Sequence, residues 1–210
     1  DTAGLRRQSR VKDSLEYYSA LRTARVVQEA DVCLVLVDAT EELASQDLKV
    51  VEQAWEAGSG VVLLINKWDL VEKDTYTASD LEKEIRQKAT FLQWVPILFT
   101  SALTGQRARK ALDLVLEVQE ERHRRVETHE VNEALEQIVR HQPPPHARGR
   151  PVKIRYGTQV AVAPPTFVFF CNLPKEIPAH YIRYVRNSLR KRWGFHGTAL
   201  RIRFRKSQGK

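Results

Sequence analysis

The residues best suited to chemistry lie in segment 66–69, which reads NKWD. The carboxylate of Asp69 can only accept hydrogen bonds, and it can accept two side by side from the adjacent ring N–H and exocyclic amine of guanine. Adenine offers no such pair of donors. The amide of Asn66 can link neighbouring loops, and the methylenes of Lys67 can cover one face of a base. The segment therefore predicts a guanine-reading loop, the alternative being an ordinary polar turn.

A second candidate segment, 101–105, reads SALTG. Its backbone N–H groups can donate to the carbonyl oxygen of guanine, and we expect that of Ala102 to do so. Adenine carries a donor at that position, so an N–H there would discriminate against adenine. We predict that Ser101, Ala102 and Leu103 contribute to the base site. Taken alone, these three residues fit an ordinary turn equally well.

The first residues, DTAGLRR, have the Asp-x-x-Gly spacing with which a nucleotide switch loop begins. We predict that Asp1, Thr2, Ala3 and Gly4 bind nucleotide, the alternative being that Asp1 is merely solvated. A phosphate-binding loop of the form Gly-x-x-x-x-Gly-Lys-Ser/Thr occurs nowhere in the 210 residues. We therefore expect the base-reading half of a nucleotide site without the half that holds phosphates, as if a longer protein were cut at its second switch.

Three short apolar runs, 32–37, 61–65 and 97–100, are typical of strands, and the first two have the β-branched content of strands buried on both faces. Stretches with helical spacing of apolar residues separate the runs. This alternation predicts a parallel α/β sheet with right-handed crossovers. Ligands of such sheets bind beyond the carboxyl ends of the strands. Asp38, NKWD and SALTG follow the three runs in turn, so they are the residues expected to meet there.

The composition is that of a soluble globular protein, with 42% hydrophobic and 29% charged residues. No apolar run approaches the roughly 18 residues of a membrane-spanning helix, and no basic-then-apolar leader begins the chain. We expect a cytoplasmic protein without a membrane partner. The two cysteines lie in apolar runs and the six histidines show no metal-ligand spacing with them, so we predict neither a disulfide nor a Cys/His metal site.

The formal net charge of +8 is unevenly divided along the chain. Residues 1–127 contain 18 Lys and Arg against 22 Asp and Glu, a net −4, whereas residues 128–210 contain 16 against 4, a net +12. Modules of opposite charge favour different partners, so we predict a domain boundary between residues 127 and 128. The alternative is one helix across this boundary, because apolar residues keep a roughly helical spacing from Leu112 to Val126.

Residues 128–210 show helix, strand, strand, helix and strand patterns in that order, which predicts an αββαβ domain. The last helix and the last strand are rich in cations and almost free of acids. Such a surface can follow a phosphate backbone, and arginine can also stack on exposed bases. The alternatives are a solvated basic face and a face that packs against the acidic first module. The RNA-binding residues that we predict are Arg183, Arg186, Arg190, Lys191, Arg192, Arg201, Arg203 and Arg205.

Seven segments read DTAGLRR, EYYSALRTARVVQEADVCLVLVDATE, NKWDLVEKD, FTSALTGQR, HQPPP, GTQVAVAPPTFVFFCN and GFHGTALRIRFRK. Together they resemble the second G domain and the C-terminal KH-like domain of the Der (EngA) family, bacterial GTPases with two G domains. The resemblance covers essentially all 210 residues. It implies part of a P-loop GTPase domain followed by a small α+β KH-like domain. It also implies binding of GTP or GDP with magnesium, and a role in assembly of the large ribosomal subunit.

The resemblance also implies roles for residues near the start of the chain. Asp1 matches the aspartate that holds magnesium through water, and Gly4 matches the glycine whose N–H senses the γ-phosphate. Leu5 stands where Ras-like GTPases carry the glutamine that orients the attacking water, and leucine cannot polarise water. The family resemblance points to a potassium ion as a compensating charge.

The segment GFHG, from Gly194 to Gly197, resembles the Gly-x-x-Gly clamp with which KH domains hold nucleic acid. It lies between a helix and the last strand, whereas the KH clamp joins two helices. We therefore predict that both glycines serve a turn. We also predict that Trp193 and Phe195 beside them belong to the core.

We interpret the chain as part of a ribosome-assembly GTPase, with an incomplete G domain over 1–127 and a basic KH-like domain over 128–210. Its expected partners are guanine nucleotide, ribosomal RNA and the large ribosomal subunit, and no DNA partner is expected. GTP hydrolysis is expected of the longer parent and not of these residues alone. The competing interpretation is a nucleotide-independent RNA-binding module with a vestigial G domain. A metabolic α/β enzyme is a third, but no nucleophile, base and orienting residue are grouped at the strand ends.

Overall fold

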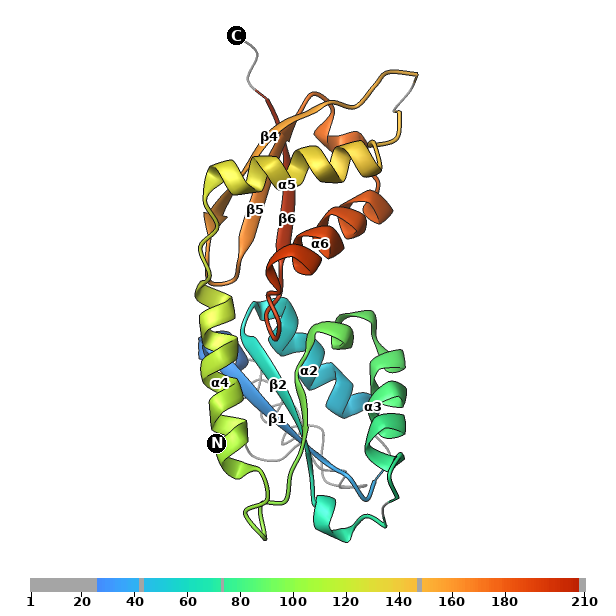
Figure 1. Cartoon of the computed structure of the whole chain (residues 1–210), viewed down its shortest axis with the longest axis vertical. Helices are drawn as coiled ribbons and strands as arrows, with labels where there is room; N and C mark the ends of the chain where they lie inside the picture. The colour runs from blue at the N-terminus through green and yellow to red at the C-terminus, as the bar shows by residue number, and fades with distance from the viewer. Residues whose placement is uncertain (1–25, 42–43, 73, 147–148, 208–210) are drawn as a thin grey trace, which may run out of the picture. The chain divides into compact units, whose positions relative to one another are not determined.

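Two compact units make up the computed structural model (Figure 1), which describes residues 26–41, 44–72, 74–146 and 149–207. The first unit holds the described residues up to Glu120 together with His196–Thr198. The second unit holds Glu121–Phe195 and the described residues from Ala199 onward. The domain boundary that we place between residues 127 and 128 stays a prediction.

A parallel sheet forms the centre of the first unit, with the strand order β1 (Val32–Asp38), β2 (Gly60–Asn66) and β3 (Ile97–Phe99). Each strand lies within one residue of a predicted apolar run at both ends. β1 and β2 pair along their whole length, from Val32 opposite Gly60 to Asp38 opposite Asn66. The predicted parallel α/β class is confirmed, and the carboxyl ends of the three strands lie at one edge of the sheet.

Helices cover both faces of this sheet, and the unit also has two 3-10 turns. In chain order these elements are α2 (Ser45–Ala57), η1 (Trp68–Leu70), α3 (Thr77–Lys88), η2 (Thr90–Trp94) and α4 (Ala108–His123). On one face, Val51 of α2 and Ile85 of α3 share a core with Leu63 of β2. On the other face, Leu64 of β2 shares a core with Val118 of α4. The layers are therefore helix, sheet and helix, as expected for a parallel sheet.

The outer strand β1 departs from the prediction of burial on both faces. Leu34 and Leu36 are 37% and 56% exposed, whereas every residue of β2 except Asn66 is buried. Within the described residues β1 has a neighbouring strand on one side only, so its apolar run is shielded less than that of β2. The apolar run predicted the strand correctly, but the burial of both its faces was wrong.

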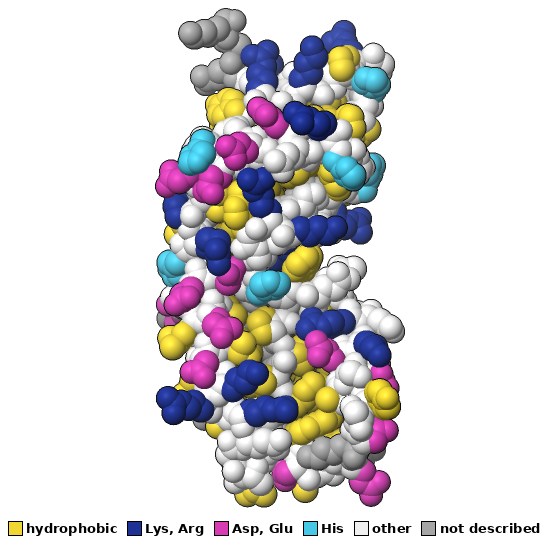
Figure 2. Space-filling view, viewed as in Figure 1, with side chains coloured by type: hydrophobic (Ala, Val, Ile, Leu, Met, Phe, Trp, Pro, Cys, Tyr) yellow, Lys and Arg dark blue, Asp and Glu magenta, His cyan; other side chains and the backbone are white. Residues whose placement is uncertain are grey.

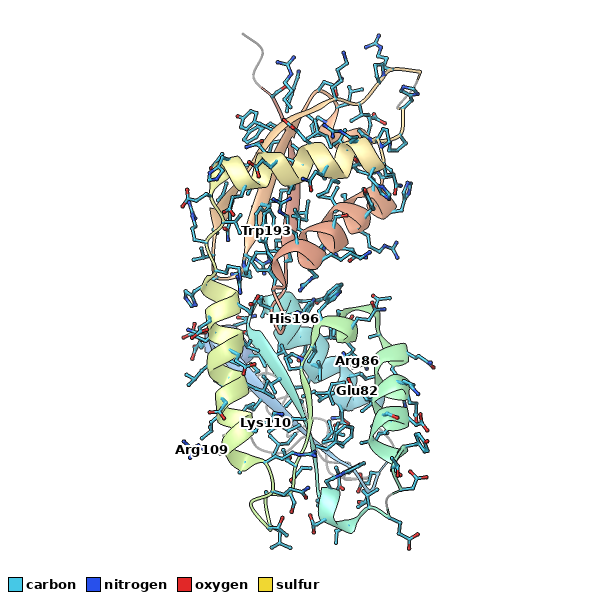
Figure 3. All side chains as sticks on the ribbon, viewed as in Figure 1. Glu82, Arg86, Arg109, Lys110, Trp193 and His196 are labelled. Carbon is cyan, nitrogen blue, oxygen red and sulfur yellow. The ribbon has the colours of Figure 1, made fainter. Side chains whose placement is uncertain are left out.

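The side chain of Arg86 ties helix α3 to the segment that leads into β3 (Figure 3). Its Nη2 lies 2.6 Å from Oε1 of Glu82, one helical turn earlier. Its Nη1 donates to the carbonyl oxygens of Leu92, at 2.5 Å, and Val95, at 3.3 Å. The guanidinium thereby satisfies two carbonyl groups near the end of η2 and holds the chain that enters β3.

The second unit has the predicted αββαβ order: α5 (Thr128–His141), β4 (Ile154–Ala161), β5 (Thr166–Cys171), then the turn η3 (Pro174–Glu176), α6 (Ala179–Trp193) and β6 (Arg201–Lys206). Its sheet has the order β4-β5-β6, with β4 antiparallel and β6 parallel to β5. Both helices pack on one side, and Figure 1 shows α5 crossing in front of the strands. Their shared core contains Leu135, Phe167, Phe169, Val185 and Leu189.

The GFHG segment forms a turn after α6, as predicted. Gly194 and Gly197 have φ angles of +86° and +67°, in the left-handed region that favours glycine. Phe195 is fully buried in the core of the second unit. Trp193 packs against the same core, and its ring stacks on Phe167 with 6.2 Å between centroids (Figure 3). The predicted core positions of these two aromatic residues are therefore confirmed.

The helices of the described residues are of ordinary globular length. The longest are α4, with 16 residues, and α6, with 15. None of the helices in the described part of the chain combines the length and apolar character that crossing a bilayer requires.

Candidate functional site

The carboxyl-end edge of the first sheet brings three of the predicted segments together. The N–H of Ala39, just after β1, donates to the carbonyl of Asn66 at 2.8 Å. The N–H of Trp68, just after β2, donates to the carbonyl of Thr100 at 3.0 Å, at the start of the SALTG loop. The segment 37–40, which reads VDAT and contains Asp38, therefore lies beside the NKWD segment, which in turn lies beside the SALTG segment, and main-chain hydrogen bonds join them.

Asn66 links the NKWD and SALTG loops through its side chain. Its Oδ1 accepts a hydrogen bond of 2.9 Å from the N–H of Ala102, which confirms the loop-linking role that we predict for Asn66. The same bond engages the N–H that we expect to face the carbonyl oxygen of guanine, so donation by Ala102 to the base stays a prediction. In this structure Asn66 takes that donor, because the side chain reaches across from the end of the neighbouring strand. A bound base would share the donor with Asn66 or use another amide of the loop.

The side chain of Lys67 is held at its charged end by Asp38. Lys67 Nζ lies 2.5 Å from Asp38 Oδ2, and Asp38 Oδ1 accepts from the N–H and Oγ1 of Thr40 at 3.0 and 2.7 Å. Burial raises the pKa of Asp38, but the hydrogen bonds from Lys67 and Thr40 outweigh it and lower the pKa to about 2. Asp38 is therefore ionised at neutral pH and fixes the ammonium group.

This ion pair leaves the stem of Lys67 stretched between the ends of β1 and β2. The Lys67 backbone is in the left-handed region, with φ 61° and ψ 31°, and the loop closes with a 3.0 Å bond from the N–H of Leu70 to the Lys67 carbonyl. The sequence placed Asp38 at this edge, but we predicted no binding role for it. The signal that could have found it is its place in VDAT, directly after the first apolar run.

Trp68 anchors the NKWD loop in the core. It is 4% exposed, and its ring lies against Phe99 of β3 with 4.4 Å between centroids. The neighbouring Asp69 is half-buried in the η1 turn. Because the buried Trp68 ring holds the η1 turn against the sheet, Asp69 lies at the carboxyl ends of the strands.

The SALTG loop divides into a buried and an exposed part. Ser101 is 1% exposed, and its Oγ accepts from the N–H of Thr104 at 3.2 Å. Ala102 is exposed, and Leu103 is 87% exposed. Ser101 therefore shapes the loop, while the next two residues present its backbone to solvent. The four other predicted nucleotide-binding residues, Asp1, Thr2, Ala3 and Gly4, lie outside the described residues.

The predicted basic surface is only partly exposed. Figure 2 shows dark blue Lys and Arg side chains over α6 and around the end of β6. Arg192 Nη1 donates to Oε1 of Gln137 at 3.0 Å and its Nη2 lies 3.6 Å from Glu133 Oε2, so this side chain joins α6 to α5. Arg186 and Arg201 are half-buried. The exposed members of the set are Arg183, Lys191, Arg192, Arg203 and Arg205.

Arg190 belongs to the interior and not to this surface. It is 2% exposed, and its Nη1 donates to the carbonyl of Phe195. Oε2 of Glu121 accepts from the N–H of the same Phe195 at 2.5 Å. Burial, reinforced by the nearby charge of Arg186 and opposed by that of Glu121, lowers the pKa of Arg190 to about 9. The side chain closes the turn after α6 and is not available to a phosphate.

Two family models match this sequence. Residues 125–205 match the model described as KH-domain-like of EngA bacterial GTPase enzymes, C-terminal. Residues 17–143 match the model described as elongation factor Tu GTP binding domain. The second match covers more than half of the chain.

Similar proteins include GTPase Der of Gemmatimonas aurantiaca, 54% identical over 207 residues, which are 98% of this chain and 48% of that protein. GTPase Der of Caldanaerobacter subterraneus subsp. tengcongensis is 45% identical, over 98% of this chain and 47% of that protein. The chain spans about half the length of the curated relatives it matches. Among solved structures, Aquifex aeolicus Era bound to GDP·AlF4− is 17% identical with a TM-score of 0.48, covering 98% of this chain and 74% of that one.

Proposed function

We propose, on the premise that this chain belongs to the Der (EngA) family of bacterial GTPases, that its first unit reads the guanine base of GTP and GDP. The observation that carries the proposal is the 2.9 Å hydrogen bond from the Ala102 N–H to Asn66 Oδ1. It joins the loop that holds Asp69 to the SALTG loop at the carboxyl ends of β2 and β3. One planar base can therefore meet both loops at once, as ligands of parallel sheets do.

Each residue of the site has a defined part in this proposal. Asp69 accepts from the ring N–H and the exocyclic amine of guanine. Lys67, whose ammonium group is held by Asp38, covers one face of the base with its methylenes. Backbone amides of the exposed residues Ala102 and Leu103 meet the guanine carbonyl oxygen, while Asn66 and the buried Ser101 hold the loops.

The phosphate side of the site is proposed from the family alone. Asp1 is the residue proposed to hold magnesium through water, and Thr2, Ala3 and Gly4 are proposed to follow the γ-phosphate. Because Leu5 cannot polarise water, a potassium ion is the proposed compensating charge in the longer relatives. The 210 residues hold no Gly-x-x-x-x-Gly-Lys-Ser/Thr stretch, and GTP hydrolysis is proposed for the full-length relatives.

The second unit is proposed to contact ribosomal RNA during assembly of the large ribosomal subunit, in the cytoplasm. The net charge of +12 over residues 128–210 supports this part of the proposal. So does the match of residues 125–205 to the KH-domain-like family of EngA GTPases. We propose residues 1–127 and 128–210 as the corresponding functional domains.

A titration of a fluorescent GDP analogue against the 210-residue chain, with magnesium present, tests the nucleotide part. We expect guanine-selective binding with a Kd near or below about 100 µM, which corresponds to roughly −5.5 kcal/mol. The control is the matching ATP analogue, which lacks the paired donors that Asp69 requires. Equal binding of the two analogues would contradict the proposed reading of guanine.

A nucleotide-independent RNA-binding module is the second candidate, and the net charge of +12 over residues 128–210 favours it. The two candidates differ in the same titration. RNA binding that persists while neither analogue binds would support the second candidate. Guanine-selective binding would eliminate it.

A further inference from the structure

The helices of the second unit pack on one face of its sheet, and the opposite face, called the open face below, is exposed only in part. On that face Val168 is 1% exposed, and Thr158 hydrogen-bonds Thr128 at the start of α5. In β5, Phe167 and Phe169 point into the core beneath α5 and α6. Successive residues of a strand point to opposite faces, so Val168 and Phe170 lie on the other side. In β6, Ile202 and Phe204 pack against the helix-side core, which places the arginines that alternate with them on the open face.

An aromatic pair occupies this open face. Tyr156 of β4 is opposite Phe170 of β5, and the two rings stack with 4.5 Å between centroids and 13° between planes. Tyr156 is 46% exposed and Phe170 is half-buried. Because the two rings stack face to face, each covers one face of the other, and the outer face of the more exposed Tyr156 is the aromatic surface that the pair leaves to solvent.

A β-bulge brings Tyr156 to this face. Ile154 is opposite Cys171 on the helix side, and the register shifts by one residue before Tyr156 meets Phe170. Without the bulge, Tyr156 would point to the same side as Ile154. An irregularity of β4 thus exposes a large aromatic side chain that regular pairing would bury.

The third strand adds cations beside the aromatic pair. Arg205 is opposite Phe170 and Arg203 is opposite Val168, and both arginines are exposed. Tyr156, Phe170 and Arg205 therefore form one row across the three strands. None of the residues of β4, β5 and β6 is acidic, so no carboxylate of the sheet neutralises this row.

We propose that this open face, defined by Tyr156, Phe170, Arg203 and Arg205, binds single-stranded RNA. The proposal rests on the RNA-contacting function proposed above and assigns it a surface and a mode of recognition. An unpaired base stacks on the outer face of Tyr156, and Arg203 and Arg205 contact the phosphates of the strand. The GFHG turn and the cations of α6 are not part of this surface.

The chemistry of the face favours single strands over a duplex. The exposed ring of Tyr156 offers nothing to bases that are already stacked and paired, whereas an unpaired base gains about 1–3 kcal/mol from stacking on an aromatic side chain, as alanine substitutions measure it. A protein partner of complementary chemistry would have to bring acidic side chains to the arginines. The acid-free sheet and the stacked rings together match a nucleic-acid strand, which supplies phosphates and π-faces at once.

Fluorescence anisotropy of the 210-residue chain with a labelled oligouridine of about 12 nucleotides tests the proposal. We expect Tyr156→Ala to weaken binding about tenfold and Tyr156→Phe, which keeps the ring, to bind as the parent chain does. Tyr76→Ala is the matched control, because Tyr76 is 68% exposed and belongs to the first unit. A duplex RNA of the same length is expected to bind more weakly than the single strand.

The arginines are tested by the dependence of binding on salt. The double variant Arg203→Gln with Arg205→Gln is expected to lower the slope of log K against log salt by about 1.4, since each phosphate contact of a single strand contributes about 0.7. Arg140→Gln is the control, because Arg140 is exposed on α5, on the helix side of the same unit.

Two results would overturn the proposal, and they are distinguishable. If Tyr156→Ala binds RNA like the parent chain while Arg183→Gln with Lys191→Gln does not, the surface is α6 and only this inference fails. If the parent chain binds no RNA at all, the RNA-contacting part of the proposed function fails as well.

Discussion

Replacing Gly197 with alanine is expected to destabilise the first unit by about 3 kcal/mol, from left-handed backbone strain of roughly 1–2 kcal/mol and overpacking of roughly 1–3 kcal/mol. The φ angle of Gly197 is +67°, and an added Cβ would lie 2.4 Å from Cγ2 of Val118. The backbone cannot easily move aside. The Gly197 N–H donates to the Trp94 carbonyl at 2.7 Å, and its carbonyl accepts from the Val61 N–H at 2.6 Å.

Urea denaturation of the variant and the parent chain measures this loss, and one control separates its two causes. Gly105 has a φ angle of +75°, but an added Cβ there would meet no atom within 4 Å. Gly105→Ala should therefore show the backbone cost alone, about 1 kcal/mol. If Gly197→Ala were no more destabilised than Gly105→Ala, the expected overpacking of the new Cβ against Val118 would be contradicted.

The double variant Gly197→Ala with Val118→Ala tests the crowded contact itself. Removing the Val118 methyl groups takes away the atoms that the new Cβ would meet. The two substitutions should therefore be non-additive, with the double variant about 1–2 kcal/mol more stable than the sum of the single changes predicts. Strict additivity would show that the two side chains do not meet.

Replacing Asp69 with asparagine is expected to change the preference between GDP and xanthosine diphosphate by about 100-fold or more in favour of xanthine. A carboxylate accepts two hydrogen bonds from guanine, whereas an asparagine amide offers one acceptor and one donor. The NH2 group of asparagine would face the exocyclic amine of guanine. Both of these groups are donors, so neither would have an acceptor. Xanthine carries a carbonyl oxygen at that position, so the asparagine amide can donate to this oxygen and accept from the ring N–H.

Competition of GDP and xanthosine diphosphate against the fluorescent analogue measures this reversal. Asp80→Asn is the matched control, because Asp80 is an exposed aspartate of α3 that pairs with Lys83 at 2.9 Å. It removes the same charge from the same unit and should keep the preference for GDP. A loss of GDP preference in both variants would attribute the effect to net charge and not to base reading.

The strands around the site were predictable because the apolar runs and the order of the elements along the chain indicate the same parallel sheet. The apolar runs 32–37, 61–65 and 97–100 are short and each is followed by a polar residue, so their strand character and order could be read directly. The loops follow from that order, since parallel strands bring their carboxyl ends to one edge. Only the exposure of Leu34 and Leu36 differed, because burial depends on neighbours in space and not on the run itself.

The loop-linking role of Asn66 was predictable, but the atoms that pair between the loops were not. The ion pair of Asp38 with Lys67 joins residues from two strands, and the Ala102 N–H is taken by Asn66 from a loop 36 positions away. Neither pairing leaves a local pattern in the chain. Arg190 was misplaced for a related reason, because a charged side chain is ordinarily exposed and only the fold reveals the carbonyl of Phe195 that holds it in the interior.

The open face of the second sheet illustrates a different limit. The alternation in β6 predicts an arginine face, and the structure has one. The aromatic pair beside it depends on the bulge between Ile154 and Tyr156, which reverses the alternation of β4. The sequence of β4 alone does not reveal this one-residue register shift, because a bulge is defined only by the pairing with the neighbouring strand β5.

The central claim, that the loops at the carboxyl ends of β1, β2 and β3 read guanine, is tested most directly by NMR of the ¹⁵N-labelled chain. GDP and ADP are each added to about 1 mM, a concentration that detects even weak binding. We expect GDP, and not ADP, to shift the amide signals of Asn66, Lys67, Asp69, Ala102 and Leu103. Equal shifts with both nucleotides, or no shift of these amides with GDP, would contradict the claim.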